Sequence, residues 1–148
     1  RKRALRQLCA AAPPNGVGTP PALAEDIEAA AAELEQSCPG QPAGAKLEGV
    51  WDLLYCTAPG NSSGKLGPFV GQVTQVFIDD TRFSNDVELF GILKISLEVL
   101  REVKDDYTIK VKFQELAVSL FGTEVFRKEA KGAGVWKQRY VDDDLRVM

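Results

Sequence analysis

The feature that most constrains this fold is a change in hydrophobic periodicity near residue 46. Before it, apolar side chains recur every three to four residues, as on a helix; after it, they alternate with polar ones, as on a strand. The segment ILKISLEVLREVKDD is the best example, because most of its large apolar residues share one phase and its charged residues share the other. Such alternation predicts antiparallel strands with one buried face and one face in water.

Similar alternating runs occur on both sides of this segment. One begins in LEGVWDLLYCT at residues 47–57, a second runs from Val73 to Phe77, and a third follows the pair Asp105-Asp106. That acidic pair separates two apolar runs and predicts a tight hairpin. A series of short strands with no helix between them predicts a β-sandwich or an up-and-down barrel.

In a barrel, the in-phase apolar side chains would point inward and line a site for one small apolar ligand. The alternative is a packed interior without a cavity, since small barrels are often filled by their own side chains. The predicted lining residues are Leu53, Tyr55, Phe77, Leu93, Ile95, Leu97, Ile109, Val111 and Phe113.

The first 45 residues have helical rather than alternating patterns. Residues 1–12 predict a short basic helix, either a solvated helix end or a contact with anionic lipid. After a Pro- and Gly-rich stretch, Thr19 predicts an N-cap for a second, acidic helix that extends to about residue 37. We therefore divide the chain into an N-terminal helical segment and linker, residues 1–45, and a β-barrel, residues 46–148, within one structural domain.

Composition excludes several classes of function. A net charge of −3 argues against strong nucleic-acid binding, and no apolar run approaches the length of about 18 residues that a membrane-spanning helix needs. The chain has no histidine, which removes Ser–His and Cys–His pairs and imidazole metal ligands. Three widely spaced cysteines predict neither a zinc site nor a disulfide framework, and fit a reducing compartment.

Two motifs near the ends of the alternating region stand out. Gly49 and Trp51 open the first strand, where an indole can plug one end of a barrel and a glycine lets another backbone segment pass close by. The segment 135–148, VWKQRYVDDDLRVM, carries three consecutive aspartates. Neighbouring side chains on a strand point to opposite faces, so we interpret Asp142–Asp144 as turn caps and ion-pair partners of Lys137, Arg139 or Arg146, not as a metal site.

These motifs together resemble the plastid-lipid-associated protein family, also called the fibrillins. LEGVWDLLYCT is similar to the family's entry strand, GKLGPFVGQVTQVFID to its second strand, and YVDDDLRVM to its ending. The helix ending in LEQSCPG also resembles the family's leader, so the resemblance covers most of the chain. Family members usually continue through a turn into one more strand after the position of Arg146, so we expect the last barrel strand to be missing here.

The resemblance implies a mainly β (α+β) fold: an antiparallel lipocalin-like β-barrel with an N-terminal helical segment packed on it. It implies a non-enzymatic protein that binds prenylquinones, carotenoids or acyl chains, or has a structural role, at plastoglobules and thylakoids. It brings no catalytic residue and no cofactor. A plastid location follows from it, with a transit peptide absent from these 148 residues.

Arg146 is the most specific candidate for a ligand-site residue that the resemblance provides. In lipocalin-like barrels an arginine from a late strand often packs over the tryptophan of the Gly-x-Trp motif, so we expect Arg146 to cover Trp51 as a cation–π lid. The alternative is a solvated arginine paired with Asp142 or Asp144. Trp51 and Arg146 thus complete the predicted ligand site.

Two other functions stay open on the sequence alone. A protein–protein adaptor would have a solid barrel and use its acidic helix or an open edge strand for contact. An enzyme acting on an apolar substrate would need a carboxylate such as Asp52 or Glu115 near the cavity. The partly apolar stretch 65–69, KLGPF, is compatible with a rim that touches a lipid surface.

Overall fold

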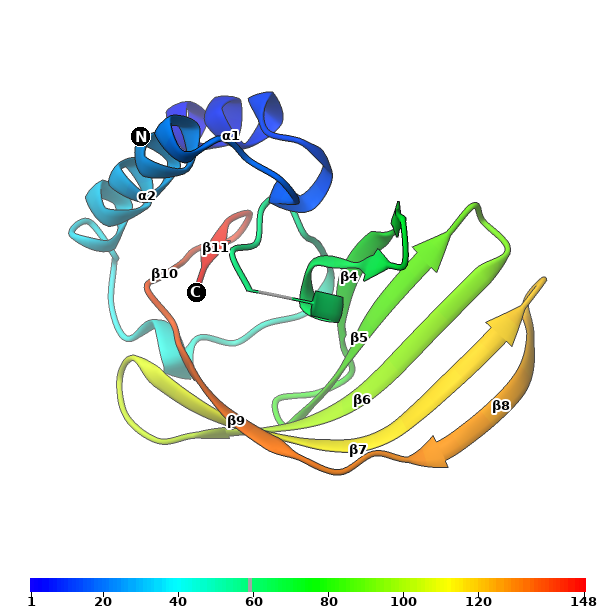
Figure 1. Ribbon diagram of the computed structural model, residues 1–148. Coiled ribbons are helices and arrows are strands. Elements are labelled where there is room, and N and C mark those ends of the chain that lie inside the picture. Colours follow the sequence, from blue (N-terminus) through cyan, green and yellow to red (C-terminus); the bar gives the residue numbers. More distant parts are fainter. Residues whose placement is uncertain (59) are drawn as a thin grey trace.

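The computed structural model describes residues 1–58 and 60–148. It has two layers: a strongly curved antiparallel sheet, and a pair of helices that lie across the open side of that curve (Figure 1). The predicted mainly β class with an N-terminal helical segment is therefore confirmed.

The main sheet has seven strands in the order β1-β4-β5-β6-β7-β8, and β9 also pairs with β7. Every pair is antiparallel, and most neighbours along the chain are joined by a short turn. The strands are β1 (Gly49–Asp52), β4 (Gln72–Phe77), β5 (Arg82–Leu89), β6 (Leu93–Val103), β7 (Thr108–Leu120), β8 (Thr123–Glu129) and β9 (Ala133–Lys137). A separate hairpin, β2 (Lys65–Leu66) with β3 (Phe69–Val70), precedes β4.

The alternating sequence forms strands because it gives each of them one apolar face. The predicted hairpin at Asp105-Asp106 is confirmed, since it joins β6 to β7, which pair over almost their whole length. The register between them shifts at Glu98 and Val99, where β7 has an extra residue. Such a bulge increases the local twist and helps a long sheet to curl.

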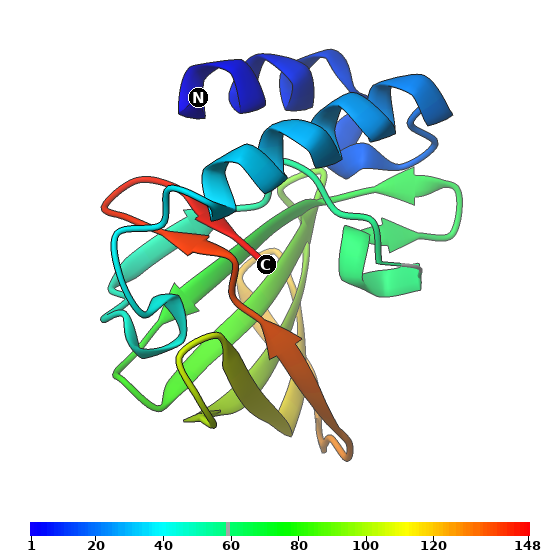
Figure 2. The ribbon, with the colours of Figure 1, turned by 90° about the vertical axis from the view of Figure 1, so that its left-hand side faces the viewer.

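Closure of the sheet into a barrel is not confirmed. In the described part of the chain β1 forms one edge of the sheet, and β8 with β9 forms the other. The space between the edges is occupied by the C-terminal hairpin, β10 (Tyr140–Val141) with β11 (Arg146–Val147), and by the helices (Figures 1 and 2). These elements take the position where a closing pair of strands would have to meet.

The helices α1 (Lys2–Ala11) and α2 (Pro21–Glu35) pack on the C-terminal hairpin. Three 3-10 turns lie between the larger elements: Pro14–Gly16, Pro42–Gly44 and Gly60–Ser63. The apolar stripe of α2 is buried at Ile27, Ala31 and Leu34, against Tyr140 and Leu145 of the hairpin region. This cluster joins the two parts into which we divided the chain, and the division itself stays a prediction.

Two local predictions are wrong. The α2 N-cap position is Pro20 rather than Thr19, whose hydroxyl donates a hydrogen bond to the carbonyl oxygen of Gly16 at 2.7 Å. Gly49 was expected to allow close approach of another segment, but a Cβ there would meet nothing within 4 Å. Its φ of +76° is the reason for glycine, because side chains disfavour that conformation.

Candidate functional site

The concave face of the sheet brings most of the predicted ligand-site residues together, but in two different settings. Towards the C-terminal hairpin the face is covered and packed. Towards the opposite end of β6 and β7 it carries half-buried apolar side chains. We call these regions the covered half and the open half.

The covered half is a packed core. Phe77, Ile109 and Val111 are buried in it, and Trp51, Leu97 and Phe113 pack against it while partly exposed. Phe83, which sequence reasoning missed, lies at its centre with no exposed surface and stacks on Phe77 with ring centroids 5.2 Å apart. The rings of Phe83 and Trp136 are 6.0 Å apart. Here the predicted inward direction of the stripe holds, but the side chains fill the space themselves.

Arg146 enters this core from β11. Its guanidinium lies over the ring of Phe77, 5.4 Å from the centroid. Its Nε donates to Gln138 Oε1 at 2.9 Å, and its Nη1 donates to Gln75 Oε1 at 2.5 Å. Burial, with a smaller contribution from nearby Arg101, lowers the pKa of Arg146 to about 9, so the group is still charged at neutral pH.

The expected partner of Arg146 was Trp51, and the structure corrects this. Among the described residues its cation–π contact is with Phe77, the cross-strand neighbour of Gly49 in β1. The indole of Trp51 instead donates its Nε1 hydrogen to the carbonyl oxygen of Glu48 at 3.1 Å. The physical reason is that Gln75 and Gln138 both accept hydrogen bonds from the guanidinium and hold it above the ring of Phe77.

Arg101 is a second cation of this face that sequence reasoning missed. It is in phase with the inward stripe of β6, and only 8% of its surface is exposed. Its Nη2 donates to the carbonyl oxygens of Ala43 and Ala45, at 2.7 and 3.0 Å. Arg101 thus fastens the linker after α2 to the sheet. Its phase in the alternation was the available signal, but its charge argued against an inward position.

The open half contains Leu93 and Ile95 of the predicted set. Both lie on β6 and are half-buried. Cross-strand pairing places Ile95 beside Val87 of β5 and Val118 of β7, which are also half-buried. Phe126 of β8 follows in the same row and is 51% exposed. The open half is therefore an apolar strip that crosses four strands.

Leu53 and Tyr55 do not join the concave face. β1 ends at Asp52, after which the chain passes beneath the helices. Tyr55 packs with the helical cluster, and Leu53 lines a hollow of about 280 Å³ together with Leu54 and residues of α1. Their alternation with Asp52 predicted a longer strand than the one that forms.

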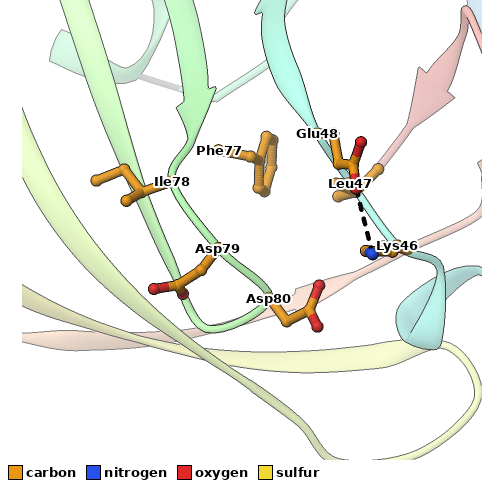
Figure 3. A pocket seen from close by; sticks show the side chains of 7 residues that line it. All are labelled: Lys46, Leu47, Glu48, Phe77, Ile78, Asp79 and Asp80. Carbon is orange, nitrogen blue, oxygen red and sulfur yellow. Dashed lines mark ion pairs between the residues drawn. The ribbon is translucent and has the colours of Figure 1, made fainter.

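A larger hollow, of about 440 Å³, opens beside the turn between β4 and β5 (Figure 3). Its walls mix apolar and charged groups: Phe77 and Leu47 face it, with Asp79 and Asp80 on the turn below and the Lys46–Glu48 ion pair alongside. Hydrogen bonds from Thr81, through its backbone amide and then its hydroxyl, and from Arg82 lower the pKa of Asp79 to about 2. Asp79 therefore stabilises the turn and is a poor general base.

The three aspartates of the C-terminal segment form a turn and an attachment point for α1. Asp142 accepts hydrogen bonds from the amides of Asp144 and Leu145, which confirms their expected capping role. The cation partners differ from those expected, because Lys2 and Arg6 of α1 pair with Asp142 and Asp144. The described residues contain no group of three metal-ligating side chains.

Partial burial by itself would raise the pKa of Asp142. Hydrogen bonds from Lys2, Tyr140 and Asp144 outweigh that effect and hold its pKa well below the usual range. Asp142 therefore stays ionised at neutral pH and keeps α1 in place.

Comparison with known proteins agrees with the sequence motifs. The PAP_fibrillin family model matches residues 2–148, nearly the whole chain. The searches of curated proteins and of solved structures found no match to this chain. In the described part of the chain, no helix has both the length and the apolar character required to cross a membrane.

Proposed function

The chain belongs to the PAP_fibrillin family of plastid lipid-associated proteins, and on that premise we propose that it binds an apolar lipid without transforming it. The ligand class is a prenylquinone, a carotenoid or a fatty acyl chain. The open half of the concave face is the binding surface in this proposal. The place of action is the plastoglobule or the thylakoid surface.

The observation that carries this proposal is the uncovered apolar strip of the open half. Val87, Ile95 and Val118 form a continuous row across β5, β6 and β7, and Phe126 extends it onto β8. An elongated hydrocarbon chain laid along this row would remove its remaining apolar surface from water, at roughly 25 cal/mol for each Å². Val87 has the phase of the buried Phe83 on β5, and Ile95 has that of the buried Val99 on β6, so the row lies on the same face of the sheet as the covered half.

The covered half supplies the rigid part of such a site. The stacked Phe77 and Phe83 and the buried Val99 fix the curvature of β4, β5 and β6, because these residues are cross-strand neighbours. A packed core next to an open apolar strip is an arrangement in which the protein itself need not rearrange to accept a ligand.

Several observations support a role without catalysis. Asp52 and Glu115, the carboxylates that an enzyme would need, are exposed, and they alternate with the inward residues Trp51 and Leu116. Glu115 is moreover paired with Arg127 at 2.5 Å. Neither carboxylate has the position of a general base for a substrate on the concave face.

The proposal is tested by co-purification. The full chain, mixed with a lipid extract of thylakoids and repurified, is expected to carry a prenyl lipid or acyl lipid detectable by solvent extraction and mass spectrometry. The double variant Ile95→Asn, Val118→Asn should reduce the bound lipid at least about tenfold, because it places two amides under the hydrocarbon. The matched control is Val125→Asn, at a position that is 56% exposed on β8 and out of phase with Phe126.

Three results would contradict the proposal. The first is a wild-type chain that retains no lipid. The second is a double variant that retains as much as the wild type. The third is recovery of a chemically altered lipid, which would indicate an enzyme. Capture of a protein through the free edge of β8, with no lipid bound, would favour the adaptor function.

A further inference from the structure

Three hairpins lie at the open end of the sheet, and each has a large exposed apolar side chain in its turn or directly beside it. Their turns join β2 to β3, β5 to β6 and β7 to β8 (Figure 1). Phe69 is 48% exposed, Phe90 70%, Ile92 42% and Phe121 80%. We call these four residues the aromatic rim.

The rim is one connected surface. The rings of Phe69 and Phe90 meet edge to face with centroids 5.1 Å apart, which links the first turn to the second. The amide of Phe121 donates to the carbonyl oxygen of Ile92 at 2.9 Å, which links the second turn to the third. Each turn is thus fixed by its neighbour, and the exposed side chains are held next to one another.

Two of the rim residues have an unfavourable backbone conformation. Phe90 and Phe121 have φ angles of +56° and +51°, and each precedes a glycine that also has a positive φ. Both central positions of a type I′ turn require this, and asparagine followed by glycine is the preferred sequence there. A bulky side chain at positive φ is strained. Since both rings are mostly exposed, and the aromatic ring that Phe90 contacts belongs to Phe69, itself 48% exposed, packing in the core does not account for their presence.

The same short sequence, Leu-Phe-Gly, stands at 89–91 and at 120–122. None of residues 66–69, 89–93 and 120–123 is charged. The charges that directly flank these segments balance, because Lys65 and Lys94 are basic and Glu88 and Glu124 are acidic. Lys94 is paired with Asp86 at 3.1 Å, and Glu124 with Arg127. The rim therefore matches an uncharged partner and provides no attraction for an anionic one.

From these observations we propose that the aromatic rim inserts into the surface of a neutral lipid layer and docks the protein there. Three turns that project from one end of a sheet suit a soft surface that the side chains can enter. Strain at Phe90 and Phe121 is the kind of local cost that structures retain at functional positions. Insertion would bury rings that folding leaves exposed.

This inference rests on the proposed function and deepens it, because docking through the rim would bring the open half next to the lipid layer that holds its ligand. The rim is continuous with that half, since Leu93 directly follows one turn, Leu120 directly precedes another, and the two residues pair with each other. A chain can hold a lipid and still fail to dock, or dock and hold none, so the two tests fail separately.

The test uses flotation of the delipidated full chain with phosphatidylcholine vesicles. We expect the wild-type chain to float with the vesicles, and to do so equally in about 0.5 M salt, because no charge attraction is involved. The double variant Phe90→Asn, Phe121→Asn should bind at least about tenfold more weakly. Its thermal midpoint should be equal to or above that of the wild type, because asparagine suits a type I′ turn.

The matched control is Tyr107→Asn, which removes a 48% exposed aromatic ring at the turn between β6 and β7, the opposite end of the sheet. It should float like the wild type. The proposal is overturned if the wild type does not float, or if the Asn variant floats as well as it does. It is also overturned if that variant loses several degrees of thermal stability, since the rings would then be part of the core. Self-association through the rim without flotation would identify a second copy as the occupant and likewise overturn it.

Discussion

At the scale of single residues, replacement of Arg146 should have a large effect on the free energy of unfolding. Its guanidinium satisfies Gln138, which is 1% exposed, as well as Gln75. Arg146→Met leaves both glutamine oxygens without their donor and should lower the free energy of unfolding by about 3 kcal/mol. The free energy of unfolding of Arg146→Lys should lie between those of the wild type and Arg146→Met, because an ammonium group cannot reproduce the planar geometry of the guanidinium. Urea unfolding measures both.

Arg82 provides the comparison for that experiment. It pairs with Asp79 at 3.0 Å on the surface, and its side chain is 48% exposed. Arg82→Met should therefore cost much less than Arg146→Met. Equal losses for the two variants would mean that the buried glutamines do not depend on Arg146.

Some side-chain positions could be predicted from the sequence, and others could not. The inward position of Phe77, Ile109 and Val111 followed from alternation alone. Arg101 was missed because its charge contradicts the stripe to which it belongs, and two backbone carbonyls from a distant linker are what make its burial tolerable. The partner of Arg146 could not be predicted, because it depends on Gln75, which lies 71 residues away in the sequence.

At the scale of elements, the contact between α1 and the C-terminal hairpin should depend on acidity. The folded pKa of Asp142 lies below its unfolded value of about 4, so its contribution to stability is fully present above that pH. It is lost as the pH falls through the folded pKa. Asp142→Asn should thus cost about 1–3 kcal/mol at pH 7, and the difference from the wild type should shrink steadily below about pH 4.

Thermal or urea unfolding from neutral to strongly acidic pH measures this difference. Asp143→Asn is the neighbouring control, since its side chain is exposed and it should change stability little at any pH. A stability difference for Asp142→Asn that does not vary with pH would contradict the assignment of Asp142 as the ionised anchor of α1.

The elements themselves were partly predictable. The two helices and the hairpin at Asp105-Asp106 followed from periodicity and turn residues. Packing of the helical segment on the sheet was predicted, but the ion pairs that attach α2 were not: Arg139 pairs with Glu28 and Glu35 at 2.8 Å each, across more than 100 residues of sequence. An acidic helix and a basic strand indicate that such pairs exist, but periodicity gives no information about which ones form.

At the scale of the whole molecule, the sequence pattern could not predict whether the sheet closes into a barrel. Alternation is the same in an open curved sheet and in a closed barrel, because it reports only which face of each strand is apolar. The difference depends on what lies between β1 and the β8–β9 edge. Here the C-terminal hairpin and helices occupy that space, which leaves one half of the concave face packed and the other half uncovered.

This asymmetry predicts unequal hydrogen exchange along β7. Both halves of the strand are hydrogen-bonded on both sides, to β6 and to β9 or β8. Ile109 and Val111 are almost completely buried, whereas Leu120 is 40% exposed and every residue of β8 is exposed. Local opening should be easier where little apolar surface holds the strands. Amides at 109–113 should exchange at least about tenfold more slowly than those at 116–120.

Phosphatidylcholine vesicles extend this measurement to the proposed docking. If the rim inserts, they should slow exchange at residues 119–123 and leave 109–113 unchanged, because only the first segment lies at the lipid. Equal protection along the whole of β7 without vesicles would mean that the open half is held as firmly as the covered half. The uncovered strip would then be a rigid extension of the core, and the predicted difference in local stability between the two halves would be wrong.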